Sequence, residues 1–172
     1  MIPSIIDWTD PMEVGRLLAR TALLEDRAME DAASGALGPS GELPVTCMVN
    51  AREEMVVAGV PMASLVFEEL PWDTAVVPLV AEGERVAPGT DIARIQGSAS
   101  AVLRGERVFL NILGRMCGIA TITSLYVDIC RGTGVEVLDT RKTTPGMRAL
   151  EKYAVRTGGV STTVIHLRTW PC

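Results

Sequence analysis

The hydrophobic positions change their spacing several times along the chain, which indicates a domain of mixed helices and strands. Asp10 followed by Pro11 is typical of a helix start, and apolar residues continue at helical spacing as far as Leu23. Shorter apolar runs between turn residues predict strands and a second helix. The predicted elements are strands over 45–49, 55–58 and 75–80, a helix over 61–70, turns at 82–84 and 88–90, and a loop over 30–35.

The longest apolar segment, residues 108–130, has hydrophobic residues near helical spacing. Arg115 and Asp128 interrupt it, and two charges in a lipid-facing helix would be costly. The segment is therefore predicted to be a buried helix that connects two parts of the protein, rather than a membrane span. Gly114 and Gly118 are expected to let another element approach this helix closely, at some cost to helix stability.

A strand, a polar loop and a helix are predicted next. Residues 135–138 form a short apolar run, and a proline fits the first turn of a helix predicted over 146–155. Between them Arg141 and Lys142 stand side by side, where an α/β protein gathers its ligands. Arginine can hold a carboxylate or phosphate with two hydrogen bonds, and lysine adds a compact charge. A solvated basic turn is the alternative interpretation.

Longer motifs surround this loop. Residues 139–146 read Asp-Thr-Arg-Lys-Thr-Thr-Pro-Gly, with Gly-Glu-Arg at 105–107 before them and Glu-Lys-Tyr-Ala-Val-Arg at 151–156 after them. Together with Gly-Glu-Arg-Val-Ala-Pro-Gly at 83–89, these motifs resemble the quinolinate phosphoribosyltransferase family. The resemblance covers most of the chain, from about residue 17 to residue 159.

This resemblance implies an α+β N-terminal sandwich domain with a hammerhead-like β segment, followed by the first β/α unit of an incomplete α/β barrel. The first domain would take residues 1–113, including the connecting helix, and residues 114–172 would begin the barrel. The family also implies a homodimer whose active sites combine residues of both subunits. A whole β/α barrel needs about 250 residues, so only about one of its units fits after residue 134.

The family activity is phosphoribosyl transfer to quinolinate with decarboxylation. Quinolinate and phosphoribosyl pyrophosphate, with Mg²⁺, give nicotinate mononucleotide, pyrophosphate and CO₂ in a step of NAD biosynthesis. Both substrates are multiply anionic, so the reaction requires several cations in the site. Catalysis is then expected to rest mainly on positioning and electrostatic stabilisation.

The resemblance assigns four substrate-binding residues. Arg107 matches an arginine that reaches across the dimer to a carboxylate of quinolinate, and Arg141 matches a second carboxylate-binding arginine. Lys142 matches the lysine near phosphoribosyl pyrophosphate, and Thr140 matches the neighbouring threonine. No catalytic residue and no metal ligand is assigned, because those parts of the family pattern lie beyond the matching segment.

From the residues alone, Arg107 is more simply an exposed helix arginine paired with Glu106 or Asn111. Two alternatives concern the whole chain. One is a non-catalytic fragment that serves as an association module. The other is a related nicotinate phosphoribosyltransferase or molybdenum-transport-associated homologue. A biotinyl or lipoyl carrier, suggested by the glycine-rich turns at 82–89, is a poor fit because no lysine precedes Lys142.

Residues 160–172 depart from the resemblance. The family continues with Asn-His-Arg, whereas this chain reads Val-Ser-Thr-Thr-Val from residue 160, and His166 and Arg168 are not adjacent. One added base in a suitable codon choice would restore Asn-His-Arg, so we hypothesise a frameshift or truncation, which resequencing the DNA would test. We expect no useful turnover from the chain alone.

Composition narrows the setting. The 172 residues are 48% hydrophobic and 22% charged, which suits one globular core, and the net charge of −5 argues against a nucleic-acid surface. Four cysteines without a Cys-x-x-Cys pair, and one histidine, make a zinc site or disulfide framework a poor prediction. The first residues lack the pattern of a signal peptide, so a reducing, cytoplasmic setting is expected.

Overall fold

A computed structural model describes residues 6–160 of the chain. In this part, helices and short strands are packed into an α+β fold, as predicted, and the strands form no closed barrel. The elements in order are α1 (Pro11–Glu25), η1 (Ala28–Glu30), α2 (Ala32–Ala36), η2 (Gly38–Glu42), β1 (Pro44–Asn50), β2 (Met55–Val56), α3 (Val60–Glu68), β3 (Ala75–Pro78), β4 (Arg85–Val86), β5 (Asp91–Ser98), α4 (Ala99–Cys130) and α5 (Arg148–Thr157).

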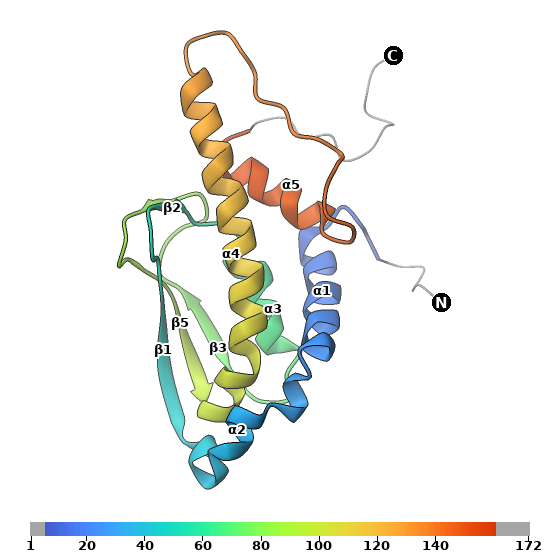
Figure 1. Cartoon of the computed structure of the whole chain (residues 1–172), viewed down its shortest axis with the longest axis vertical. Helices are drawn as coiled ribbons and strands as arrows, with labels where there is room; N and C mark the ends of the chain where they lie inside the picture. The colour runs from blue at the N-terminus through green and yellow to red at the C-terminus, as the bar shows by residue number, and fades with distance from the viewer. Residues whose placement is uncertain (1–5, 161–172) are drawn as a thin grey trace.

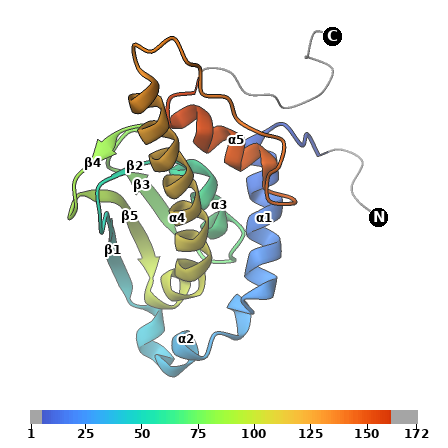
Figure 2. The same cartoon turned by 45° about the horizontal axis from the view of Figure 1, so that its top comes forward.

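The strands form two antiparallel sheets beside one long helix (Figure 1). The larger sheet has the order β1-β5-β3, and its register pairs Ile95 of β5 with Cys47 of β1 and Val76 of β3. The smaller sheet pairs β2 with β4. Helix α4 lies against the sheet on one side and against α3 and α1 on the other (Figures 1 and 2), so it carries much of the hydrophobic core.

The contact between α3 and α4 is centred on two aromatic rings. Phe67 and Phe109 are both buried, with ring centroids 5.6 Å apart and planes tilted by 44°. Phe67 can approach because residue 105 is glycine: a Cβ built on Gly105 would lie 2.4 Å from the Phe67 Cε1 atom. Although α4 is long and apolar enough to cross a membrane by length and composition, it packs here as a core helix.

The predicted close approach at Gly114 and Gly118 is wrong. A Cβ at either glycine would meet nothing within 4 Å, because both face open space on α4. The close contacts lie instead at Gly105 and at Gly158, where an added Cβ would lie 2.5 Å from the Ala120 carbonyl oxygen. Helical spacing therefore identified the helix but not the face on which its neighbours pack.

Two local predictions are also wrong. Residues 135–138 are not a strand, and the Val135 and Leu138 side chains are exposed. Within residues 6–160 no strand pairs with this run, and an extended segment needs such a partner for its backbone groups. Residues 30–35 are not a loop, because the Asp31 carboxylate accepts from the Ser34 N–H at 2.6 Å and caps α2.

Other predicted elements are confirmed with shifted ends. Asp10 caps α1 by accepting from the Met12 N–H at 2.7 Å, as the sequence indicated. The long helix starts at Ala99, where the Ser98 hydroxyl caps it, rather than near residue 108. The domain division at residue 113 stays a prediction, and α4 continues unbroken through it.

Glu82 joins three parts of the fold. Its carboxylate accepts from the Gly59 N–H at 2.6 Å and the Val60 N–H at 3.0 Å, and so satisfies the first donors of α3. The Tyr153 hydroxyl of α5 donates to the same carboxylate at 2.9 Å. Burial and this hydrogen bond to Glu82 raise the pKa of Tyr153 to about 12.

Gly105→Ala and Gly114→Ala are a matched pair of helical substitutions. In each variant, the lower entropy of alanine in the unfolded chain raises the free energy of unfolding by about 0.5–1 kcal/mol. At residue 105 the new methyl group overlaps Phe67, which costs about 1–3 kcal/mol, so we expect net destabilisation. At residue 114 we expect a small gain in stability. Urea unfolding of both variants measures the two signs, and equal changes would contradict the Gly105–Phe67 contact.

The raised pKa of Tyr153 makes stability depend on alkaline pH. A pKa above the unfolded value gives stability that is present below pH 10 and is lost as the pH rises toward 12. The partly exposed position limits this loss to about 1–2 kcal/mol. Tyr153→Phe is expected to be less stable than wild type at pH 8, by about 1 kcal/mol for the lost hydrogen bond, with a gap that narrows above pH 10.

Denaturant unfolding from pH 8 to pH 11.5 measures that gap. Tyr126→Phe is the control, because the Tyr126 side chain is exposed on α4. The prediction fails if Tyr153→Phe follows the wild-type alkaline slope as closely as Tyr126→Phe does.

Candidate functional site

The basic loop predicted from the sequence lies between α4 and α5. In Figures 1 and 2 the orange segment that follows α4 passes along α5 before it enters that helix. Thr140, Arg141 and Lys142 are all exposed there, and the Lys142 N–H donates to the Thr140 hydroxyl at 3.1 Å. Within residues 6–160, the Arg141 and Lys142 side chains make no hydrogen bond or ion pair, so both cations can meet a ligand.

A buried ion pair fixes the start of this loop. The Lys152 Nζ atom of α5 lies 2.5 Å from the Asp139 Oδ2 atom, and the two side chains are only 1% and 5% exposed. Asp139 directly precedes Thr140, so α5 holds the backbone at the point where the basic loop begins. Lysine is rarely buried this deeply unless it is paired.

Arg148, in the first turn of α5, holds the middle of the loop. Its guanidinium donates to the Thr143 hydroxyl at 3.2 Å and to the Arg141 carbonyl oxygen at 3.4 Å. The second bond engages the backbone of Arg141 and leaves the side chain of that residue exposed.

Glu151 and Arg115 hold the end of the loop. The Thr144 N–H donates to the Glu151 carboxylate at 3.3 Å, and Arg115 of α4 donates to Glu151 at 3.0 Å and to the Thr144 hydroxyl at 2.6 Å. Burial alone would raise the pKa of Glu151, but the hydrogen bonds from Arg115 and Thr144 outweigh it and keep that pKa below its ordinary value. The carboxylate therefore stays charged and bridges α4, α5 and the loop.

Arg107 lies apart from the loop. Its guanidinium binds the two carboxylate oxygens of Asp26 at 2.7 and 2.8 Å, so neither Glu106 nor Asn111 is the partner. Within residues 6–160, no hydrogen bond or ion pair joins it to Thr140, Arg141 or Lys142. Arg115, which does reach the loop, lies eight residues further along α4, or about 12 Å along the helix axis.

Two hollows lie near these groups. One, of about 390 Å³, runs between α1 and α4 from Asp26 past Asn111 and Arg115 to Met147. The other, of about 240 Å³, lies beside residues 143–146. Either one can admit a small polar molecule next to the network that holds the loop.

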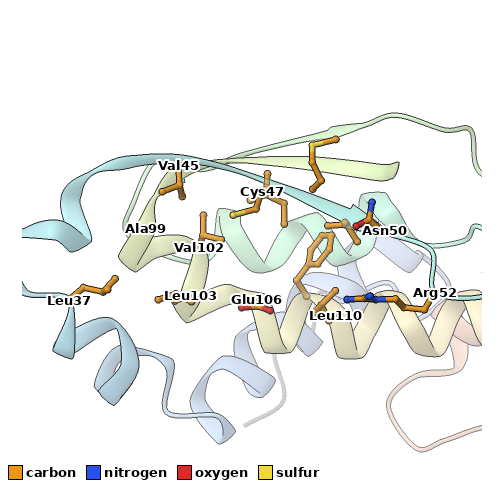
Figure 3. A pocket seen from close by; sticks show the side chains of 14 residues that line it. Leu37, Val45, Cys47, Asn50, Arg52, Ala99, Val102, Leu103, Glu106 and Leu110 are labelled. Atoms are coloured by element: carbon orange, nitrogen blue, oxygen red, sulfur yellow. The ribbon is translucent and has the colours of Figure 1, made fainter. Parts of the chain in front are cut away.

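A third groove lies on the other side of the molecule and contains none of the predicted site residues. It has a volume of about 590 Å³ between β1 and α4, whose side chains face each other across it (Figure 3). Apart from Asn50, Arg52 and Glu106, its lining is mainly apolar. Its chemistry does not suit a multiply charged substrate.

The arrangement can bind anions, and the described residues contain no metal site of their own. Between residues 6 and 160, no three His, Cys, Asp or Glu side chains come close enough to hold a metal ion. Two adjacent cations and a hydroxyl can hold carboxylate or phosphate oxygens. The assignment of Arg107, Thr140, Arg141 and Lys142 as substrate-binding residues stays a prediction.

Sequence reasoning missed the residues that support the loop. Arg115 lies in none of the quoted motifs, and Glu151 and Lys152 lie in the motif at 151–156, which by itself gives them no role toward the loop. Asp26, the partner of Arg107, also lies outside the motifs. One signal was readable for Lys152: it lies three residues after Ala149 on the buried face of α5, where an apolar residue is expected. A lysine at such a position needs a buried carboxylate, and Asp139 provides it.

Comparisons with known proteins agree with these motifs. Two family models match: "Quinolinate phosphoribosyl transferase, N-terminal domain" over residues 31–117 and "Quinolinate phosphoribosyl transferase, C-terminal domain" over residues 119–169. The nicotinate-nucleotide pyrophosphorylase (carboxylating) of Mycobacterium leprae is 42% identical over 150 residues, which cover 86% of this chain and 52% of that protein. The probable enzyme of the same name from Bacillus subtilis is 38% identical over 140 residues, covering 80% and 48%.

Solved structures of the same family also resemble this chain. The nicotinate-nucleotide pyrophosphorylase from Francisella tularensis matches with a TM-score of 0.81 and 31% identity, over 88% of this chain and 54% of that one. The chain thus spans about half the length of these relatives. The family model that covers half of the chain, and the shared fold, show that the chain belongs to the quinolinate phosphoribosyltransferase family.

Proposed function

We propose that this chain supplies part of the site for phosphoribosyl transfer to quinolinate, while no useful turnover is expected from the chain alone. The reaction joins the quinolinate ring nitrogen to the ribose carbon of phosphoribosyl pyrophosphate, expels pyrophosphate and releases one carboxyl group as CO₂, which leaves nicotinate mononucleotide. Membership of the family and the names of the relatives support this activity. Its setting would be NAD biosynthesis in the cytoplasm.

One observation carries the proposal: Arg141 and Lys142 are adjacent, exposed and without a side-chain partner in the described part of the chain. Other arginines of the fold, such as Arg16 and Arg107, are engaged by carboxylates. Adjacent free cations suit a site for two anionic substrates. Arg141 would hold a quinolinate carboxylate, Lys142 the phosphoribosyl pyrophosphate, and the Thr140 hydroxyl would add a hydrogen bond.

Mg²⁺ is proposed to enter with phosphoribosyl pyrophosphate. The described residues hold no cluster of metal ligands, so the pyrophosphate oxygens would supply much of the coordination. The metal would offset the negative charge on the leaving pyrophosphate. The residues of this chain would bind and orient the two substrates.

A homodimer is proposed because Arg107 is held away from the loop of its own subunit. Asp26 directs the Arg107 guanidinium along the end of α1, and Arg107 has no bond to Arg141 or Lys142. Arg107 would then complete the site of a second subunit. Since Asp26 is a carboxylate, it occupies Arg107 in the way a substrate carboxylate would.

Arg141→Gln tests the proposed binding of quinolinate. Titration calorimetry should show quinolinate bound by the wild-type chain, with affinity about 10- to 100-fold lower in the variant, because charged hydrogen bonds to a carboxylate are lost. Nicotinate, which has one carboxylate fewer, should bind more weakly than quinolinate to wild type. Arg16→Gln on α1 is the control, since Arg16 pairs with Glu68 and Glu69 and not with the loop.

Two results would contradict the proposal. One is equal affinity of wild type and Arg141→Gln for quinolinate. The other is wild-type binding of nicotinate as tightly as quinolinate, which would favour a nicotinate phosphoribosyltransferase instead.

A second candidate function is association, and one surface favours it. The last turns of α4 expose an apolar stripe at helical spacing, formed by Ile122, Leu125, Tyr126 and Ile129. Ile129 is the most exposed of them at 73%. Contiguous apolar surface of this kind is typical of a protein contact.

Ile129→Glu tests association. Sedimentation velocity should show self-association of the wild-type chain that weakens with this substitution, because a charge would have to be buried in the contact. Leu24→Glu is the matched control: Leu24 is 79% exposed on α1, away from the stripe. Self-association that Ile129→Glu leaves unchanged would exclude the stripe as the contact.

A further inference from the structure

The ion pair between Lys152 and Asp139 is not explained by stability alone. Both side chains are almost fully buried, with 2.5 Å between Nζ and Oδ2. Removing two charges from water is costly, and apolar residues of similar volume often stabilise a fold as well or better. A pair of this kind therefore suggests that the chain has to follow one particular course at this point.

The neighbouring contacts show which segment of the chain is positioned. One turn of α5 supplies Arg148, Glu151 and Lys152, which lie near one another on the helix because of their spacing. They hold the loop over residues 139–144 at its start, middle and end through Asp139, the Arg141 carbonyl and the Thr144 N–H. Within the described residues the loop belongs to no sheet, so these contacts set its course.

The position of Asp139 gives the pair two effects on the basic residues. Asp139 lies one residue before Thr140 and two before Arg141, so fixing its side chain against α5 fixes the direction in which the chain enters the basic loop. The pair also keeps the Asp139 carboxylate turned toward Lys152, which lies inside the fold. Released, that carboxylate would be close enough in sequence to pair with Arg141 and compete with an anionic ligand.

We propose that Lys152 and Asp139 are positioning residues, whose buried ion pair pre-organises Thr140, Arg141 and Lys142 for anion binding. The inference rests on the proposed function for the nature of the anion. Its physical content is that the loop is ordered before the ligand arrives, so that binding does not have to order it. Neither residue needs to touch the substrate.

The test is a double substitution, Asp139→Ala with Lys152→Met. It removes both charges together, so neither is left buried alone, and methionine replaces the unbranched lysine stem. Glu69→Gln is the matched control. Glu69 is a largely buried carboxylate that binds Arg16 and Arg20 between α3 and α1, away from the loop. Its loss removes a largely buried charge from an ion-pair network without touching residues 139–147.

Two measurements on the full chain separate the possibilities. Hydrogen exchange, followed by mass spectrometry, reports the order of residues 139–147 without any ligand. We expect about tenfold faster exchange there in the double variant at matched folded fraction, and no such local change in Glu69→Gln. Titration with quinolinate should give affinity about tenfold lower in the double variant, and unchanged affinity in Glu69→Gln.

The outcomes are distinct. If exchange over residues 139–147 is as slow in the double variant as in Glu69→Gln, the pair only stabilises the fold and the positioning role is overturned. If the loop loosens but quinolinate affinity does not change, pre-organisation for this anion is overturned. If wild type does not bind quinolinate, the proposed function fails, while faster loop exchange in the double variant still supports the directing role of the pair.

Discussion

The packing of the fold depends first on how closely the neighbouring elements can approach α4. At Gly105 the Phe67 ring occupies the space of a missing side chain, and at Gly158 the end of α5 lies against the Ala120 carbonyl. Gly59, with φ of +92°, lets the turn before α3 lie against Met116 in the same way. Because interiors are packed to near-crystalline density, such contacts have little freedom to shift. Helix α4 is therefore the fixed reference for the elements on both of its sides.

This constraint extends to the basic loop through α5. Gly158 seats the end of α5 on α4, and the hydrogen bond from Tyr153 to Glu82 ties the same helix to the start of α3. Once α5 is fixed, Lys152 is fixed, and with it Asp139 and the first residue of the loop. The packing of α5 on α4 and its hydrogen bond to Glu82 thus determine where the exposed cations lie. Side chains far from the loop contribute to its geometry in this way.

The sequence predicted elements whose signals are local. The Asp10 cap, the short strand predicted over 45–49 and the apolar run of α3 all reappear in the structure, because caps and apolar runs are signals that act over a few residues. The strand predicted at 135–138 failed because a strand is defined by a partner, which no local pattern supplies. Arg141 and Lys142 were found by adjacency and by family resemblance. Their support by Lys152 was missed because a buried ion pair depends on tertiary packing. The proposed frameshift concerns residues outside those the structure describes.

The distribution of charge explains how an acidic chain can offer a basic site. The net charge is −5, yet Arg16, Arg107 and Arg115 are each engaged by nearby carboxylates. Asp139 is the carboxylate nearest in sequence to Arg141, and its pairing with buried Lys152 keeps it turned inward. Lys152 thus acts on the loop electrostatically without adding an exposed charge. The positive charge of this loop therefore depends on keeping the Asp139 carboxylate turned inward as much as on placing two cations together.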